Sequence, residues 1–227
     1  LEMPNVRSIR RERITCDEEE RLRRGYEIAT HFRFASAADR LRLVHADVGP
    51  DPHQPMFRLS YGPQATLFRI NQGWKRRKDG FYVDLATGEL VSEENDNNDR
   101  APASGQPRQL AHVSLCVQGT SNILLVNPPS AIQSDESALA SLQFALQRAI
   151  EQFFQIEEAE LGSQRIGSGD HKAILYWEAA EGGAGVLRRL VDEPDTFSRI
   201  AAAALERLHF DPATGQDLNP SCTRACY

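Results

Sequence analysis

The stretch AILYWEAAEGGAGVLRRLV, residues 173–191, decides the fold class of this chain. It opens with an apolar run, typical of a strand buried on both faces, and continues from Val186 with helical spacing of its apolar residues. Gly182, Gly183 and Gly185 separate the two parts. The pattern therefore predicts a buried strand that passes through a tight glycine turn into a helix.

The glycine turn is also a candidate anion-binding site. Glycines let the backbone approach a ligand closely, and the N–H groups of a following helix point toward it. The competing interpretation is that these glycines only allow tight packing. The turn is neither a Walker A sequence nor a complete GxGxxG motif, so both interpretations stay open.

Helical spacing predicts two further elements around this stretch. Residues 135–159 have the pattern of a long helix, with Ser134 or Asp135 as its N-cap. Pro194 is expected to open another helix after the glycine turn. The apolar residues of the long helix recur every three or four positions: Leu139, Leu142, Leu146, Ala149, Ile150, Phe153 and Ile156.

The first ninety residues predict a mostly antiparallel β module. Residues 26–34 alternate between apolar and polar side chains, as in a half-buried strand. Further short strands are expected between Gly and Pro breakers, with a hairpin turn at Asp79-Gly80. These strands cover residues 41–48, 57–61, 65–70 and 81–85, and buried strands are expected later at 113–117 and 123–126.

A polar stretch at residues 92–109 is the expected boundary, since it lacks large apolar side chains and is rich in Asn, Asp, Ser and Pro. The sequence thus predicts an α+β chain. It consists of a β-rich module at 1–91, a flexible linker or loop at 92–109, and an α/β module at 110–227.

Charge limits where nucleic acid could bind. The formal net charge is −6, so affinity for DNA must come from a local patch. Lys75, Arg76, Arg77 and Lys78 form such a patch beside an aromatic residue, and phosphate contact is the functional interpretation. A solvated hairpin end is the alternative. Arg188 and Arg189, at the glycine turn, form a similar and weaker candidate.

The sequence also indicates in which cellular compartment the protein is expected. No apolar run reaches the roughly 18–20 residues of a transmembrane helix, and no signal peptide begins the sequence. Four cysteines in 227 residues are too few for a disulfide scaffold. The sequence therefore predicts a cytoplasmic protein without membrane contact.

Two cysteines at the end of the sequence, Cys222 and Cys226, have the spacing of metal ligands. A zinc or iron–sulfur site usually requires four N or S ligands. Cys16 and Cys116 could complete one only if the fold brings them close, and Cys116, in a predicted strand, is interpreted as an inert buried thiol.

Because the motif stops here and the chain opens at Leu1, we expect a piece of a longer protein. No catalytic constellation is evident.

Several of these segments resemble the C-terminal zinc-binding domain of MrfA-type superfamily 2 helicases, which also occurs in DISARM phage-defence proteins. Residues 141–146, 178–186 and 221–227 carry the resemblance. Segments 10–13 and 30–34 are similar to the region that precedes this domain in large bacterial helicases. The resemblance implies that Cys222 and Cys226 bind zinc, together with a further cysteine two residues beyond Cys226.

The resemblance also implies a function. We expect a non-catalytic accessory domain of a bacterial DNA helicase or helicase-like protein, supporting DNA engagement or partner docking, with phage defence as one setting. The ATP-binding motor would lie outside this chain, in cis or in a partner subunit, because a Walker A lysine and an acidic box are absent. Two alternatives stay open: a structural subunit-interface module without DNA binding, and a phosphate- or nucleotide-binding enzyme that uses the glycine turn.

Overall fold

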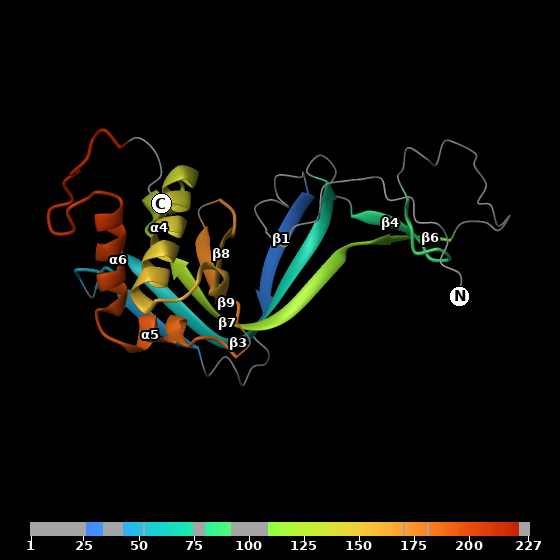
Figure 1. The fold of residues 1–227 in the computed structure, drawn as a ribbon, viewed down its shortest axis with the longest axis horizontal. Helices are drawn as coiled ribbons and strands as arrows, with labels where there is room; N and C mark the ends of the chain where they lie inside the picture. Colours follow the sequence, from blue (N-terminus) through green and yellow to red (C-terminus); the bar gives the residue numbers. More distant parts are fainter. Residues whose placement is uncertain are drawn as a thin grey trace. The chain divides into compact units, whose positions relative to one another are not determined.

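The chain divides by proximity in space into two compact units, each drawn from separate parts of the sequence (Figure 1). Unit 1 comprises Leu1–His31 and Phe68–Val117, and unit 2 comprises Phe32–Leu67 and Gln118–Tyr227. The division into 1–91, 92–109 and 110–227, based on sequence composition, stays a prediction. The computed structural model describes residues 26–33, 43–51, 53–74, 80–91, 109–169, 171–180 and 182–222.

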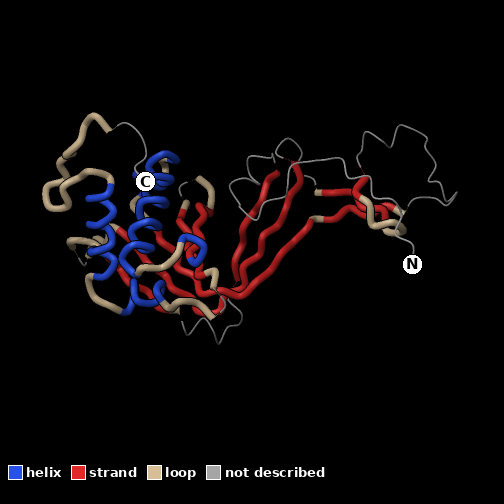
Figure 2. The backbone as a smooth tube through the Cα atoms, viewed as in Figure 1, coloured by secondary structure: helices blue, strands red, loops and turns tan. Residues whose placement is uncertain are grey.

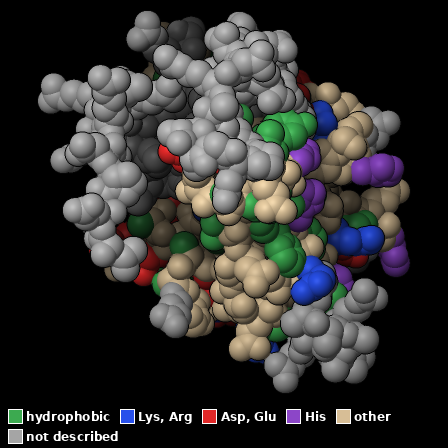
Figure 3. All heavy atoms as spheres, turned by 90° about the vertical axis from the view of Figure 1, so that its right-hand side faces the viewer, with side chains coloured by type: hydrophobic (Ala, Val, Ile, Leu, Met, Phe, Trp, Pro, Cys, Tyr) green, Lys and Arg blue, Asp and Glu red, His purple; other side chains and the backbone are tan. Residues whose placement is uncertain are grey.

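Unit 1 contains a small antiparallel sheet in the order β5-β4-β6. Its strands are β4 (Phe81–Asp84), β5 (Leu90–Val91) and β6 (Leu110–Val113). Asp84 closes the β4–β5 turn, because its side chain accepts the Ala86 N–H at 2.9 Å and its carbonyl accepts the Gly88 N–H at 2.7 Å. Hydrophobic side chains are open to solvent on the face shown in Figure 3. Among the described residues of unit 1, the exposed large hydrophobic side chains are Leu85, Leu90, Leu110, Leu115 and Val117.

A larger sheet has the strand order β1-β3-β7-β9-β8, with β2 also paired with β3. Its strands are β1 (Tyr26–Arg33), β2 (Val44–Val48), β3 (Phe57–Trp74), β7 (Leu115–Asn127), β8 (Leu161–Ile166) and β9 (Ala173–Glu178). The pairings of β9 with β7 and β8 are antiparallel and set Tyr176 opposite Leu124 and Ser163. β1 confirms the period-2 strand. The turn residue Asp79 lies outside the described residues.

Two strand predictions are wrong in their boundaries. The sequence predicts a break at Gly62-Pro63, whereas β3 continues through both residues. The irregularity lies at Gln64, whose φ is 51°. A left-handed residue inside a strand shifts the following side chains to the other face, as in a β-bulge. The predicted strand at 113–117 is divided at Ser114 between β6 and β7, and β7 then runs on through 123–126.

The helices of unit 2 lie beside its strands (Figure 2) and are α3 (Ser130–Gln133), α4 (Glu136–Phe154), η2 (Glu158–Glu160), α5 (Val186–Asp192) and α6 (Thr196–Arg207). Asp135 caps α4, as predicted, by accepting two backbone N–H groups. α4 ends earlier than predicted because Gln155 is left-handed, with φ of 54°. α6 begins after Asp195 rather than at Pro194, since Asp195 also has a positive φ, 62°.

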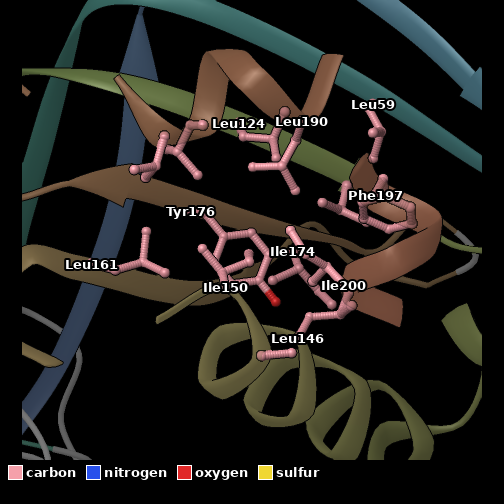
Figure 4. Packing of buried hydrophobic residues seen from close by; sticks show 14 of the residues in the cluster. Leu59, Leu124, Leu146, Ile150, Leu161, Ile174, Tyr176, Leu190, Phe197 and Ile200 are labelled. Carbon is pink, nitrogen blue, oxygen red and sulfur yellow. The ribbon is translucent and has the colours of Figure 1, made fainter. Parts of the chain in front are cut away.

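The main core lies between the helices and one face of the sheet. Figure 4 shows Tyr176 from β9 facing Ile150 and Leu146 from α4 and Ile200 from α6. A smaller cluster lies on the opposite face, because neighbouring residues of a strand point in opposite directions. That cluster consists of Ala65, Leu67, Ile123, Leu175 and Trp177.

The bulge at Gln64 explains how β3 serves both clusters. Before it, Leu59 and Tyr61 join the helix-covered core, and after it, Ala65 and Leu67 join the opposite cluster. The predicted α+β class is confirmed. None of the helices in the described ranges is long and apolar enough to cross a membrane.

Candidate functional site

The glycine turn follows β9, whose last residue is the buried Glu178, 1% exposed. A carboxylate removed from water requires partners inside the protein. The Leu187 N–H donates to its Oε1 at 3.0 Å, and Asn122 Nδ2 donates to its Oε2 at 2.8 Å. Leu187 lies in the first turn of α5, where unpaired N–H groups and the helix dipole favour negative charge. The Leu187 N–H is therefore already hydrogen-bonded to a carboxylate of the chain itself, that of Glu178.

The three glycines of the turn serve two purposes. Gly182, Gly183 and Gly185 all have positive φ, of 84°, 73° and 72°. Gly182 and Gly185 have open space where a Cβ would lie, so conformation alone favours glycine there. A Cβ on Gly183 would overlap the Glu178 carboxylate and the Asn122 amide. Gly183 is thus required for close packing as well as for backbone conformation.

Asn122, on β7, links this turn to the bulge in β3. Its Oδ1 accepts the Gln64 N–H at 3.1 Å, while its Nδ2 donates to Glu178. Tyr61 lies nearby on β3, and burial raises the pKa of its hydroxyl, with the negative charge of Glu178 adding to the effect. One hydrogen-bonded chain therefore runs from β3 through β7 to the end of β9 and the start of α5.

The arginines that follow the turn are paired with acidic residues one helical turn on. Arg188 Nε lies 2.7 Å from Asp192 Oδ2, and Arg189 Nε lies 2.6 Å from Glu193 Oε1. These hydrogen bonds raise the pKa of both guanidinium groups. Arg189 also stacks over the Phe154 ring, 4.8 Å from its centroid. Both arginine side chains are about half exposed or more, so these ion pairs contribute little to stability.

The segment after α6 is organised by backbone turns. Asp211 Oδ1 accepts the N–H groups of Thr214 at 2.8 Å and Ala213 at 2.9 Å. These bonds, the one from Thr214 foremost, hold the pKa of Asp211 below its usual value. The Leu218 N–H returns to the carbonyl of His209 at 2.7 Å. The result is a closed loop that carries the chain toward its cysteines.

Cys222 stands at the end of this loop on a tight turn. Its N–H donates to the carbonyl of Asn219 at 2.9 Å, and the Asn219 side chain accepts the Ser221 hydroxyl at 2.7 Å. The side chain of Cys222 is exposed. A thiol held on a tight turn is how metal-binding proteins commonly present close pairs of ligands.

Residues 142–227, which include most of the long helix, the glycine turn and Cys222, match the family model of the MrfA Zn-binding domain. This part of the chain is therefore similar to the MrfA Zn-binding domain family. No curated protein matches the chain. Among solved structures, the DUF1998 helicase MrfA bound to DNA is similar over 85% of this chain, with 11% identity and a TM-score of 0.42. The chain spans 23% of that protein.

The MrfA Zn-binding domain implies a zinc ion, and Cys222 has the right chemistry to be one of its ligands. Within the described ranges, no group of three or more His, Cys, Asp or Glu side chains could hold a metal. Ligands from outside these ranges would therefore have to complete the site. Cys226, the second ligand that the sequence predicts, lies outside the described residues.

The remaining predicted site residues are either outside the described residues or in a different environment from the one expected. Lys75, Arg76, Arg77 and Lys78 lie outside the described residues, as does Cys16, and their roles stay predictions. Cys116 lies in β7 but is exposed, so the interpretation of a buried thiol is wrong. Its position near the start of β7, where residues 115–120 are all exposed, accounts for the difference.

Sequence reasoning missed a polar seam between α4 and β8. Gln143 Nε2 donates to Ser163 Oγ at 2.7 Å, and that hydroxyl donates to Gln147 Oε1 at 2.6 Å. Gln147 Nε2 in turn donates to Glu151 Oε1 at 2.9 Å, and Arg148 pairs with the other oxygen of Glu151. Polar residues four apart on the long helix were the available signal, because such residues share one face.

Proposed function

We propose that this chain is a non-catalytic accessory domain of a bacterial helicase-like protein and that it supports DNA engagement or partner docking. The observation that supports the proposal is the match of residues 142–227 to the MrfA Zn-binding domain model. The tight turn that exposes Cys222 is consistent with zinc at the end of this domain. The ATP-driven motor, and any role in phage defence, belong to the longer protein in this proposal.

DNA contact is assigned to basic side chains rather than to the protein as a whole. The net charge of −6 opposes DNA, so contact requires local positive charge. The run Lys75 to Lys78 is the first candidate. Arg188 and Arg189 are the second, and they would have to exchange Asp192 and Glu193 for phosphate.

Titration of duplex DNA at several salt concentrations tests this proposal. Replacing Lys75, Arg76, Arg77 and Lys78 with glutamine should weaken binding equally for all sequences. It should also reduce the salt slope by about 0.9 per lost phosphate contact. The double variant Arg188→Gln/Arg189→Gln should have a smaller effect, because both side chains already have acidic partners.

The same titration separates the alternatives. Weak binding with little salt dependence in the unaltered chain would favour the subunit-interface module. An unchanged slope in the four-residue variant would show that its side chains face solvent. The nucleotide-binding alternative gains no support from the turn, because the Leu187 N–H already donates to Glu178.

A further inference from the structure

The carboxylate of Glu178 is surrounded by groups whose hydrogen-bonding directions are fixed. The Leu187 backbone N–H can only donate, so Glu178 Oε1 must accept. Asn122 is oriented by its other end, since its Oδ1 receives the Gln64 N–H at 3.1 Å. Its Nδ2 therefore faces Glu178 Oε2, which must also accept. A buried side chain at position 178 that meets both donors needs two acceptor oxygens.

We propose that Glu178 is the internal ligand of the glycine turn, and that with Asn122 it forms a clamp positioning α5 against β3, β7 and β9. The turn is then a structural joint closed by the chain's own anion, and it does not bind an external phosphate. This inference does not depend on whether the chain engages DNA.

Crowding at Gly183 supports the clamp. The absence of a side chain there lets the turn lie directly on the Glu178 carboxylate and the Asn122 amide. The Gly183 N–H is itself used within the turn, where it donates to the carbonyl of Ala180 at 3.0 Å. A phosphate would thus have to displace the Glu178 carboxylate to reach the Leu187 N–H.

An exchange of hydrogen-bonding partners tests the clamp. In Glu178→Gln, the new amide can accept from one donor but must turn its own N–H₂ toward the other. In Asn122→Asp, two carboxylates face each other. In the double variant, the oxygen of the introduced glutamine can accept from Leu187, and its N–H₂ can donate to the introduced aspartate. That aspartate can still accept the Gln64 N–H, and the double variant keeps the net charge of the unaltered chain.

Amide hydrogen exchange of the 227-residue chain, followed by NMR, provides the readout at Leu187. We expect each single variant to accelerate exchange at Leu187 by about tenfold or more, the loss expected for a hydrogen bond to a charged group. The double variant should recover most of this protection. Glu206→Gln, which removes an exposed carboxylate from α6, is the charge-matched control and should leave Leu187 unchanged.

Two results would overturn the proposal. One is a Leu187 amide in Glu178→Gln that is as protected as in the unaltered chain. The other is a saturable shift of the Leu187 signal when inorganic phosphate is added to the unaltered chain, since this would identify the turn as an external anion site. If either single variant fails to fold, a double variant that folds supports the clamp. A double variant that fails while Glu178→Gln folds contradicts it.

Discussion

Replacing Gly183 with alanine measures how tightly the glycine turn packs on Glu178. A non-glycine residue in the left-handed region costs about 1–2 kcal/mol. At Gly183, where φ is 73°, the new methyl group would also push the Glu178 carboxylate away from its donors. Loss of one hydrogen bond to a charged group adds about 1.5–3 kcal/mol. The total is about 2.5–5 kcal/mol, a large part of the roughly 5–15 kcal/mol that stabilises a typical domain.

Gly185→Ala is the matched control for this experiment. Gly185 has almost the same φ, 72°, but open space where the methyl group would lie. It should therefore show the conformational effect alone. Urea unfolding followed by circular dichroism should place Gly183→Ala about 1.5–3 kcal/mol below Gly185→Ala, or about 3–12 °C lower in Tm. Equal losses in the two variants would refute the argument that Gly183 is chosen for close packing.

Three further results are expected. Burial raises the pKa of Tyr176 well above its usual value of 10.0, so stability should hold below about pH 10 and fall as pH rises beyond it. Tyr176→Phe removes the hydrogen bond to the Gln143 carbonyl and should lower the free energy of unfolding by about 1 kcal/mol at neutral pH. Urea titrations at several pH values should also show a smaller loss of stability above pH 10 in this variant. In a chain extended past residue 227, metal analysis should find about one zinc ion per chain. Cys222→Ser should lose this zinc, whereas Cys116→Ser should keep it. Zinc retained in both variants would exclude Cys222 as a ligand. Phosphate-release assays should detect no ATP hydrolysis by this chain, and activity removed by Gly183→Ala would contradict that.

The sequence predicts the elements well where periodicity alone determines them. The apolar spacing from Leu139 to Phe153 gives α4 because that face must be buried against the sheet. The end of α4 depends on the left-handed Gln155, and glutamine is not a residue type that predicts this conformation, as glycine would be. Similarly, Gly62-Pro63 has the composition of a turn. In the structure both residues lie within the long strand β3, and the bulge follows them at Gln64.

The candidate site is less predictable because its contacts are distant in sequence. Glu178 ends an apolar run, which gives no hint of its partner, and Asn122 lies 56 positions away. The glycines indicate a tight turn, and the sequence leaves open whether the turn binds an external anion or only allows close packing. Nothing in a single sequence distinguishes an internal carboxylate from a bound phosphate. That distinction requires knowing that β7 and β9 are neighbours.

The arrangement of α5 and α6 shows how the segment that carries Cys222 is supported. α5 starts at the Glu178 clamp, and α6 contributes Phe197, Ile200 and Ala204 to the main core. The segment that carries Cys222 therefore leaves from a helix already held by apolar packing. Small zinc domains without such a core unfold when the metal is removed, because binding supplies their folding free energy. Cys222 is not part of the main core, so the fold of unit 2 rests on its sheet and helices rather than on Cys222.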